Sequence, residues 1–258
     1  MLQDLVRNHP ETSSPTARIY AEILTRTEDI RQAQRLRYEA FCEEYAVTLP
    51  IKAYWRNQPI DIDEFDEHCI HLAVRESYSG DIVGYTRALP SDRAKLIGDF
   101  YSAHEFDMQA IKQLPGKLLE IGRTCIRKDY RSGATIAVLW GRLVQFLLEN
   151  EYQYLFGCAS ISLADGGLQY AAIMQTLRQK HFSDEDLRVT PLLPIPNVAH
   201  EGFSALFPPL LKAYTRMGAK ICGEACWDPD FNVADVFVLL DSSAMTGRYA
   251  RHFFRTAE

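Results

Sequence analysis

The order of apolar and polar positions along the chain predicts alternating strands and helices. Apolar or alternating runs typical of strands cover residues 17–24, 70–75, 82–88, 118–126 and 152–159. Apolar side chains three and four positions apart, as in helices, cover residues 27–44, 134–149 and 208–217. Two further strand-like runs follow at residues 219–226 and 233–240. Strand, helix and strand in this order predict one mixed α/β domain, over residues 17–245.

Cap and turn residues fit these ranges. Thr27 is expected to be the N-cap of the first helix, because Glu28 and Asp29 follow in its first turn. A turn at residues 78–81 would join two of the strands into a hairpin, and Gly218 would end the last helix. The segments outside the domain are expected to be tails, a flexible one at residues 1–16 and a basic, aromatic one at residues 246–258.

One charged residue stands on an apolar helix face. Arg37 shares this face with Ile30, Ala33 and Phe41 in the helix expected at residues 27–44. One interpretation is a side chain that buries its stem and extends its guanidinium to solvent. The other is a cation that belongs to a binding site.

Composition and charge narrow the class of protein. The chain has 258 residues, of which 47% are hydrophobic, and this is enough for a sizeable core. No apolar run approaches the roughly 20 residues of a membrane span, and residues 1–16 lack the apolar core of a signal peptide, so a cytoplasmic location is expected. The net charge of −6 argues against a nucleic-acid partner. The six cysteines lack metal-site or redox spacing, so we expect reduced, mostly buried thiols.

The segment between the strand at 118–126 and the helix at 134–149 combines cations with small residues. Its sequence is RKDYRSGAT, from Arg127 to Thr135. A helix that begins there presents unpaired backbone N–H groups and the positive end of its dipole, and both favour an anion such as a phosphate. The segment is not a nucleoside-triphosphate loop, because it lacks the Gly-Lys-Ser/Thr sequence.

Several motifs stand in a characteristic order and spacing. They are YSA at 101–103 with EFD at 105–107, LEIGRTC at 119–125, DYR at 129–131, AVLW at 137–140, YLFGCAS at 154–160, PPLLKAY at 208–214, and DFN at 230–232 with Asp235. Together they resemble the bacterial ornithine N-acyltransferases of the acetyltransferase-like (GNAT) superfamily, which make the lyso precursor of ornithine lipids. The resemblance implies an α/β fold whose mixed central sheet is splayed at an acyl-pantetheine site and flanked by helices.

A more distant resemblance is to the acyl-homoserine-lactone synthases and N-acyl amino acid synthases of the same superfamily. The residues that stand in the order of the lactone synthases' characteristic positions are Arg37, Phe41, Asp61, Asp63, Asp66, Arg87, Phe100, Glu120 and Arg123. Two departures argue against S-adenosylmethionine as a substrate. Gly122 lies within the Glu-Ile-Gly-Arg motif, and the C-terminal half is similar to the ornithine enzymes.

The superfamily resemblance implies where the acyl donor binds. The strands at 118–126 and 152–159 would diverge and hold a pantetheine arm, and no cofactor would be bound permanently. The phosphate of the arm would lie on the turn formed by Arg127, Arg131, Ser132, Gly133, Ala134 and Thr135. The donor would be acyl carrier protein or coenzyme A. A basic cluster would complement an acidic carrier protein and so favours it as the donor. The alternative is that these residues form an ordinary solvated face: Arg123, Arg127, Lys128, Arg131 and Arg142.

Acyl transfer from a thioester to an amine requires a proton acceptor and a donor for the leaving thiolate. We expect Glu120 to accept the proton, directly or through water, with Arg123 beside it at the reacting carbon. A structural ion pair between these two residues is the alternative. Tyr214, in a segment similar to the superfamily's tyrosine-containing helix end, is expected to protonate the thiolate. The competing interpretation is a buried aromatic side chain on an amphipathic helix.

An amino-acid acceptor needs a cation for its carboxylate and, if it is ornithine, an anion for its distal ammonium. Arg37 and Arg87 are candidates for the first role, and Asp63 and Asp66 for the second. The alternative is that these four residues pair with one another. Phe41 joins the substrate-binding set by resemblance.

Aromatic residues are candidates for contact with the acyl chain, although at such positions they are also ordinary core: Phe100, Tyr101, Phe106, Trp140 and Phe146. No metal site is expected, because the acidic run at 61–66 lacks the glycine and the terminal glutamate of a calcium loop.

The sequence therefore favours an enzyme that moves a (3-hydroxy)acyl group from acyl carrier protein to the α-amine of ornithine. Lysine or tyrosine as acceptor, a lactone-releasing signal synthase, and a non-enzymatic acyl-thioester binding module are the alternatives. The cations and aromatic residues at 248–255 add the hypothesis of peripheral contact with an anionic membrane surface.

Overall fold

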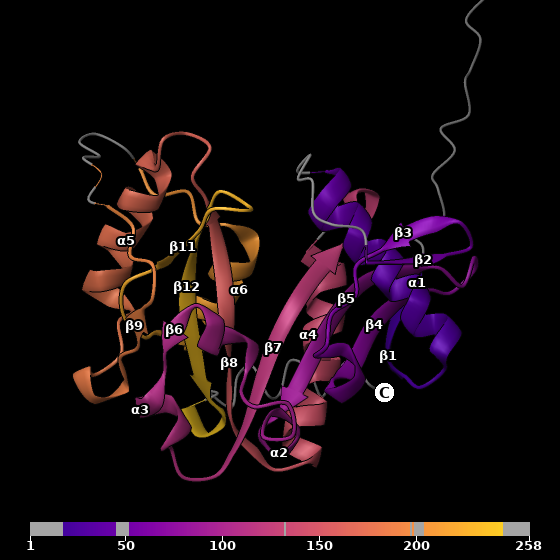
Figure 1. Ribbon diagram of the computed structural model, residues 1–258, viewed down its shortest axis with the longest axis horizontal. Helices are drawn as coiled ribbons and strands as arrows, with labels where there is room; N and C mark the ends of the chain where they lie inside the picture. The colour runs from indigo at the N-terminus through magenta and orange to yellow at the C-terminus, as the bar shows by residue number, and fades with distance from the viewer. Residues whose placement is uncertain (1–17, 45–51, 132, 197, 199–203, 245–258) are drawn as a thin grey trace, which may run out of the picture.

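A central β-sheet organises the molecule. The computed structural model describes residues 18–44, 52–131, 133–196, 198 and 204–244. The strands of the sheet are β1 (Ile19–Leu24), β4 (Ile70–Glu76), β5 (Ile82–Pro90), β7 (Lys117–Ile126), β8 (Tyr152–Ser162), β10 (Lys220–Ile221), β11 (Cys226–Asp228) and β12 (Val233–Asp241). Their order is β1-β4-β5-β7-β8-β12-β10, and β11 pairs with β12 (Figure 1). β7 and β8 run parallel, and the other neighbours are antiparallel, so the sheet is mixed.

Helices cover both faces of this sheet. They are α1 (Thr27–Tyr38, continued by a π-helical turn at Glu39–Glu43), α2 (Ser91–Ala94), α3 (Gln109–Lys112), α4 (Gly133–Glu149), α5 (Leu168–Lys180) and α6 (Pro209–Met217). Successive strand residues point to opposite faces, and in β4 this sends Leu72 into the core shared with α4, α5 and α6. Ala73, the next residue, packs in the core of α1 on the other face.

Smaller elements complete the fold on the α1 side. Two short strand pairs are β2 (Ala53–Trp55) with β3 (Gln58–Ile60), and β6 (Phe106–Asp107) with β9 (Thr190–Pro191). A 3₁₀ turn, η3, spans Tyr101–His104. Phe106 packs on Phe237 of β12, with ring centroids 5.6 Å apart, and thereby attaches this segment to the sheet.

The sheet opens between its two parallel strands. β7 and β8 pair only from Lys117 to Glu120, opposite Tyr152 to Phe156. At the next position, a Cβ atom on Gly157 would lie 2.3 Å from the backbone oxygen of Ile121, so only glycine fits where the strands still touch. Beyond this contact the strands diverge, as Figure 1 shows. The predicted splayed α/β fold is confirmed.

Most of the predicted elements are present, and the differences include, besides the unpredicted short elements, a cap, a divided strand and a helix. Thr27 is the first helical residue, and Arg26 holds the N-cap position without a side-chain cap. The run at 219–226 is split into β10 and β11 by Gly223, whose φ of 116° brings its backbone against Val189. The sequence pattern did not indicate α5, because its apolar residues surround much of the helix instead of forming one stripe: Tyr170, Ala171, Ala172, Ile173, Met174 and Leu177 are all buried.

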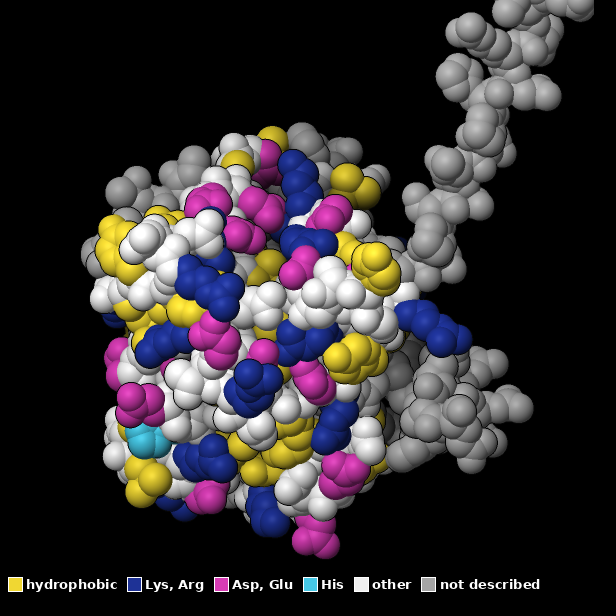
Figure 2. Space-filling model, turned by 90° about the vertical axis from the view of Figure 1, so that its right-hand side faces the viewer, with side chains coloured by type: hydrophobic (Ala, Val, Ile, Leu, Met, Phe, Trp, Pro, Cys, Tyr) yellow, Lys and Arg dark blue, Asp and Glu magenta, His cyan; other side chains and the backbone are white. Residues whose placement is uncertain are grey.

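Further expectations from the sequence concern the cysteines, membrane-spanning helices and the terminal segments. The six cysteines are free and five are buried, as predicted. Within the part of the chain that the structure describes, no helix combines the length and apolar character of a membrane span. The proposed tails at 1–16 and 246–258 lie outside the described residues. On the face at the β1 edge of the sheet, Lys and Arg side chains lie beside Asp and Glu side chains (Figure 2), as in the ion pair of Arg75 with Glu22.

Candidate active site

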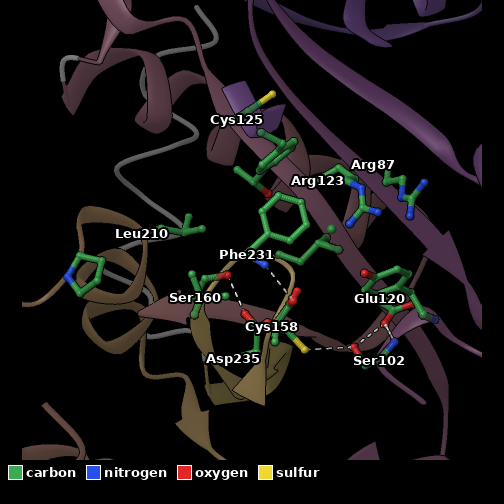
Figure 3. A pocket seen from close by; sticks show the side chains of 18 of the residues that line it. Arg87, Ser102, Glu120, Arg123, Cys125, Cys158, Ser160, Leu210, Phe231 and Asp235 are labelled. Atoms are coloured by element: carbon green, nitrogen blue, oxygen red, sulfur yellow. Dashed lines mark hydrogen bonds between the residues drawn. The ribbon is translucent and has the colours of Figure 1, made fainter. Parts of the chain in front are cut away.

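A cavity of about 630 Å³ lies where β7 and β8 diverge. Its walls come from β5, β7, β8, β12 and η3, and from the first residues of α4 and α6. Figure 3 shows Glu120 and Arg123 of β7 on one side of this cavity and Cys158, Ser160 and Asp235 of β8 and β12 on the other. The opening of the sheet therefore coincides with a group of polar side chains.

An irregularity in β7 brings Glu120 and Arg123 to the same cavity. In a regular strand two residues three positions apart point to opposite faces. Here the register shifts between Arg87, opposite Gly122, and Tyr85, opposite Cys125. Arg123 takes the left-handed conformation, with φ of 53°, and this bulge turns its side chain toward the cavity that Glu120 also lines.

The carboxylate of Glu120 is buried and held by three donors. It accepts hydrogen bonds from the backbone N–H of Tyr101 (2.8 Å) and from the N–H (2.7 Å) and hydroxyl (2.5 Å) of Ser102. Burial raises the pKa of Glu120, and these three hydrogen bonds oppose that rise. The ion pair with Arg123 that was the alternative is not formed, because Arg123 pairs with Asp61 and Asp63.

Three arginines and three aspartates form one network at the wall of the cavity. Oδ1 of Asp66 accepts from Nη1 of Arg37 at 2.6 Å and from Nη1 of Arg87 at 2.7 Å. Arg37 also pairs with Asp61, and Arg87 with Asp63. Burial alone would raise the pKa of Asp66, but the charges of Arg37 and Arg87 outweigh it and lower that pKa to about 2. Arg37, Arg87, Asp63 and Asp66 therefore pair with one another, which was the alternative to a role in binding the acceptor.

The residues of the network differ in whether they line the cavity. Arg37 is 0% exposed and, like Asp63 and Asp66, is not among the residues that line the cavity. Arg87 and Arg123 do line it. Arg123 makes the longer ion pairs, at 3.3 and 3.4 Å, and its side chain is 24% exposed. Arg123 is therefore the guanidinium best placed to meet an anionic group, whereas Arg37 is buried behind it.

The start of α4 forms the far end of the cavity. Arg131 and Gly133 line it, and Gly133 and Ala134 are exposed in the first helical turn. The hydroxyl of Thr135 donates to the backbone oxygen of Tyr130 at 2.7 Å and fixes the turn. Ser132 lies outside the described residues.

The predicted basic cluster is largely neutralised by acids of the same chain. Arg131 pairs with Glu44 at 2.6 Å, and Arg142 pairs with Glu149 at 3.4 Å. Arg127 pairs with both Asp81 and Asp129. These contacts weaken the argument that a basic patch selects an acidic carrier protein.

Two aromatic candidates are part of the core. Tyr214 of α6 is buried with its ring edge-on to Trp140, at a centroid distance of 4.9 Å, and neither lines the cavity. Burial raises the pKa of Tyr214, and the nearby Cys158 adds to the rise. A proton-donor role for Tyr214 remains a prediction.

Of the aromatic residues proposed for the acyl chain, only Tyr101 is among the lining residues of this cavity. Phe100 packs against Phe156 at 4.9 Å, in the core beside η3, so neither Phe100 nor Trp140 lines the cavity. The aromatic residues that do line it are Phe41, Phe65, Tyr101 and Phe231. Phe41 and Phe231 meet edge to face at 6.5 Å, from opposite sides of the opening.

Sequence reasoning missed several polar residues of the cavity. Ser102, Glu105, Cys158, Ser160 and Asp235 all line it. Cys158 and Ser160 are two residues apart on β8 and therefore share a face, and Asp235 of β12 is in register with Ser160. All five residues stand in the motifs that resemble the ornithine N-acyltransferases, and Cys158 and Ser160 also occupy alternate positions of one strand.

Known proteins are similar in sequence to this chain over most of its length. Residues 36–141 match the family model described as an acetyltransferase (GNAT) domain. The chain is 34% identical over 246 residues to an L-ornithine N(alpha)-acyltransferase of Rhodobacter capsulatus, covering 90% of this chain and 93% of the relative. It is 33% identical over 250 residues to a protein of the same description from Agrobacterium fabrum, covering 89% of this chain and 83% of that relative.

Solved structures share the fold at low sequence identity. FeeM, an N-acyl amino acid synthase from uncultured soil microbes, superposes with a TM-score of 0.50 at 14% identity, over 88% of this chain and 93% of its own. BjaI, a CoA-dependent acyl-homoserine lactone synthase, gives a TM-score of 0.53 at 14% identity, over 92% of this chain and 88% of its own. At these identities the likeness shows a common fold.

Proposed function

Because the chain belongs to the family of the L-ornithine N(alpha)-acyltransferases, we propose that it acylates the α-amine of ornithine in the synthesis of ornithine lipids. The observation that carries this proposal is identity of 34% over 93% of a relative's length. The cavity at the splay supports it, because it offers a cation, buried carboxylates and an apolar wall at one place.

The chemistry of the two amines of ornithine favours the α-position. An α-ammonium has a pKa near 8, whereas a side-chain ammonium such as that of lysine has a pKa near 10.4. Making the α-amine neutral near pH 7 therefore costs roughly 3 kcal/mol less. The distal ammonium stays charged and is available for recognition.

The reaction joins the α-nitrogen to the thioester carbon and releases the thiol of the donor. Glu120 is our candidate for accepting the proton that the amine loses, directly or through water. A carboxylate offers about four lone-pair sites, and three donors already occupy three of them, so one remains for the substrate. Glu120 lines the cavity, and this supports the proposed role.

The donor thioester would occupy the opening between β7 and β8. Beyond Glu120 the backbone of β7 no longer pairs with β8, so its polar groups can pair with the amides of a pantetheine arm. The phosphate would meet Arg131 and the unpaired N–H groups of α4. We retain acyl carrier protein as the donor, with coenzyme A as the alternative that shares the same phosphopantetheine chemistry.

Arg123 is the residue best placed to bind the carboxylate of the acceptor, with Arg87 as a second arginine at the cavity. Arg37 would act on the acceptor only by holding Asp61 and Asp66 in place. We place the reaction in the cytoplasm. Contact of residues 248–255 with an anionic bilayer is a separate prediction, which vesicle pelleting of the chain with and without these residues would test.

The experiment that tests the function is product analysis by mass spectrometry. The purified protein is incubated with 3-hydroxyacyl carrier protein, or with the matching acyl-coenzyme A, and an equimolar mixture of the common amino acids with ornithine. Acyl-ornithine is the expected main product. Acylation of another amino acid would contradict the acceptor, and methylthioadenosine formed when S-adenosylmethionine is added would indicate a lactone synthase.

A further inference from the structure

We propose that Glu105 and Asp235 form the subsite for the distal ammonium of the acceptor, and thereby select a diamino acid. This inference rests on the proposed function, because it assigns one part of the acceptor to one wall of the same cavity. It replaces the candidates Asp63 and Asp66, whose carboxylates are bound by Arg37 and Arg87.

The two carboxylates meet at the cavity from different elements. Glu105 follows η3 directly, and Asp235 lies on β12, opposite Ser160 of β8. The hydroxyl of Ser160 donates to Oδ1 of Asp235 at 2.6 Å. Figure 3 shows Asp235 and Ser160 across the cavity from Arg123. The site thus has arginines paired with aspartates on one wall and two carboxyl groups without a cation on the other.

Neither carboxylate has a cationic partner among the described residues. Asp61, Asp63 and Asp66 each form an ion pair with an arginine within 4.0 Å, but no such pair is found for Glu105 or Asp235. Asp235 is only 5% exposed, and Oε2 of Glu105 is fully buried without a hydrogen-bond partner in the described part of the chain. Buried carboxylates in this state are costly unless a cation reaches them.

The pKa values of Glu105 and Asp235 in the free protein are those expected of carboxyl groups that lack a cation. Burial raises the pKa of Glu105 to about 8, and the charge of Asp235 adds to this. Burial also raises the pKa of Asp235 to about 6, although its hydrogen bond to Ser160 opposes the rise. An ammonium between the two carboxylates would stabilise both charges and reverse these shifts.

The distal ammonium fits this subsite better than the α-ammonium does. The α-amine must lose its proton before it attacks, so strong stabilisation of an α-ammonium would oppose the reaction. The distal ammonium takes no part in bond formation and stays protonated near pH 7. With its carboxylate at Arg123 and its distal ammonium at Glu105 and Asp235, the acceptor would be held at both ends with the α-amine toward Glu120.

The test compares ornithine with norvaline, the same amino acid without the distal ammonium. Glu105→Gln and Asp235→Asn remove one charge each at nearly constant shape. For each variant we expect the KM for ornithine to rise roughly 10- to 100-fold, as for loss of a charge-assisted hydrogen bond. The kcat/KM for norvaline should stay within about twofold of the wild-type value or rise. Glu105→Asp, which keeps the charge, should retain a preference for ornithine.

Controls separate this proposal from its alternatives. Glu185→Gln makes the same chemical change at a side chain that is 90% exposed, and it should leave both substrates unaffected. Melting temperatures identify a variant that does not fold, and the proposal is then judged on the other variant. Equal loss of kcat for ornithine and norvaline would overturn the proposal in favour of proton transfer by this pair. Unchanged preference for ornithine would also overturn it, whereas absence of acyl-ornithine from the wild-type protein would refute the proposed function instead.

Discussion

Ser102 binds the carboxylate of Glu120 twice at one oxygen, through its backbone N–H at 2.7 Å and its hydroxyl at 2.5 Å. Because Glu120 is on β7 and Ser102 on η3, the same carboxylate lines the cavity and attaches the η3 turn to the sheet. We therefore expect substitution of Glu120 to affect both catalysis and folding, and the two effects must be measured separately.

Replacement of Glu120 by Gln should lower kcat by roughly 10²- to 10⁴-fold, because an amide is a poor proton acceptor. It should also lower the free energy of unfolding by about 1–3 kcal/mol, since its NH₂ group would face the N–H of Tyr101. Steady-state kinetics and denaturant unfolding measure the two losses. Ser102→Ala is the matched control: it removes one bond, should cost about 1 kcal/mol, and should preserve most of kcat. A fully active Glu120→Gln enzyme would exclude Glu120 as the proton acceptor.

Replacement of Gly157 by Ala should destabilise the protein by about 1–3 kcal/mol or more, because the added Cβ would lie 2.3 Å from the backbone oxygen of Ile121. The resulting shift of β7 against β8 should also weaken donor binding. Gly122→Ala is the control for stability, since no atom lies within 4 Å of its added Cβ. Equal melting temperatures for the two variants would contradict a tight contact at the start of the splay.

Replacement of Arg37 by Met should cost about 3–5 kcal/mol of stability, because it leaves Asp61 and Asp66 without one cation in a buried network. Arg56→Met removes an ion pair from the surface, where Arg56 is 69% exposed, and should cost less than about 1 kcal/mol. Urea unfolding of both variants gives the comparison. Losses of similar size would show that the network contributes no more than a surface pair.

Acid should lower the free energy of unfolding, because it removes part of the stability that this network provides. The pKa of Asp66 is lowered from its ordinary 3.8 to about 2, so its contribution is complete above pH 4 and is lost as the pH falls from about 4 to 2. Unfolding free energies measured between pH 5 and pH 2 should fall steeply in this window. Asp66→Asn should be less stable at pH 5 and show a shallower fall, and a parallel curve would contradict the assignment.

Glu105 and Asp235 should have the opposite effect on the free protein. Their pKa values are raised, to about 8 and about 6, so stability present below their ordinary values of 4.5 and 3.8 is lost as they ionise with rising pH. The charge of Asp228 raises both pKa values further, whereas a hydrogen bond with Cys158 lowers that of Glu105 and the charge of Arg123 lowers that of Asp235. The melting temperature should fall between pH 5 and pH 8 and do so less in Glu105→Gln. Saturating ornithine should reduce the fall in the wild-type protein.

The donor site makes a separate prediction at Arg131. Arg131→Ala should raise the KM for either phosphopantetheine donor several-fold, because the phosphate loses a charged partner, and should leave the KM for ornithine unchanged. Arg178→Ala, which also breaks an ion pair with a glutamate, is the control with no expected effect on either KM. A change in the KM for ornithine alone would contradict this placement of the phosphate.

The sequence by itself determined the regular elements, the superfamily and part of the site. Helical and strand periodicity follow from burial of one side of each element, so patterns such as 134–149 and 118–126 predicted α4 and β7 within a residue or two. Motifs around Glu120 and Arg123 indicated the family, which the relatives confirm. These features are encoded by residues that are close together in the chain.

Only the tertiary structure decided which charges meet. Arg37 and Asp66 are 29 residues apart, and Ser160 and Asp235 are 75 apart, so their contacts depend on how the strands and loops pack. The bulge that turns Arg123 toward the cavity depends on its pairing with β5, which local sequence does not specify. The same packing binds Asp63 and Asp66 to arginines and leaves Glu105 and Asp235 without a cation among the described residues. Long-range packing therefore determines which of the acidic residues are paired with arginines.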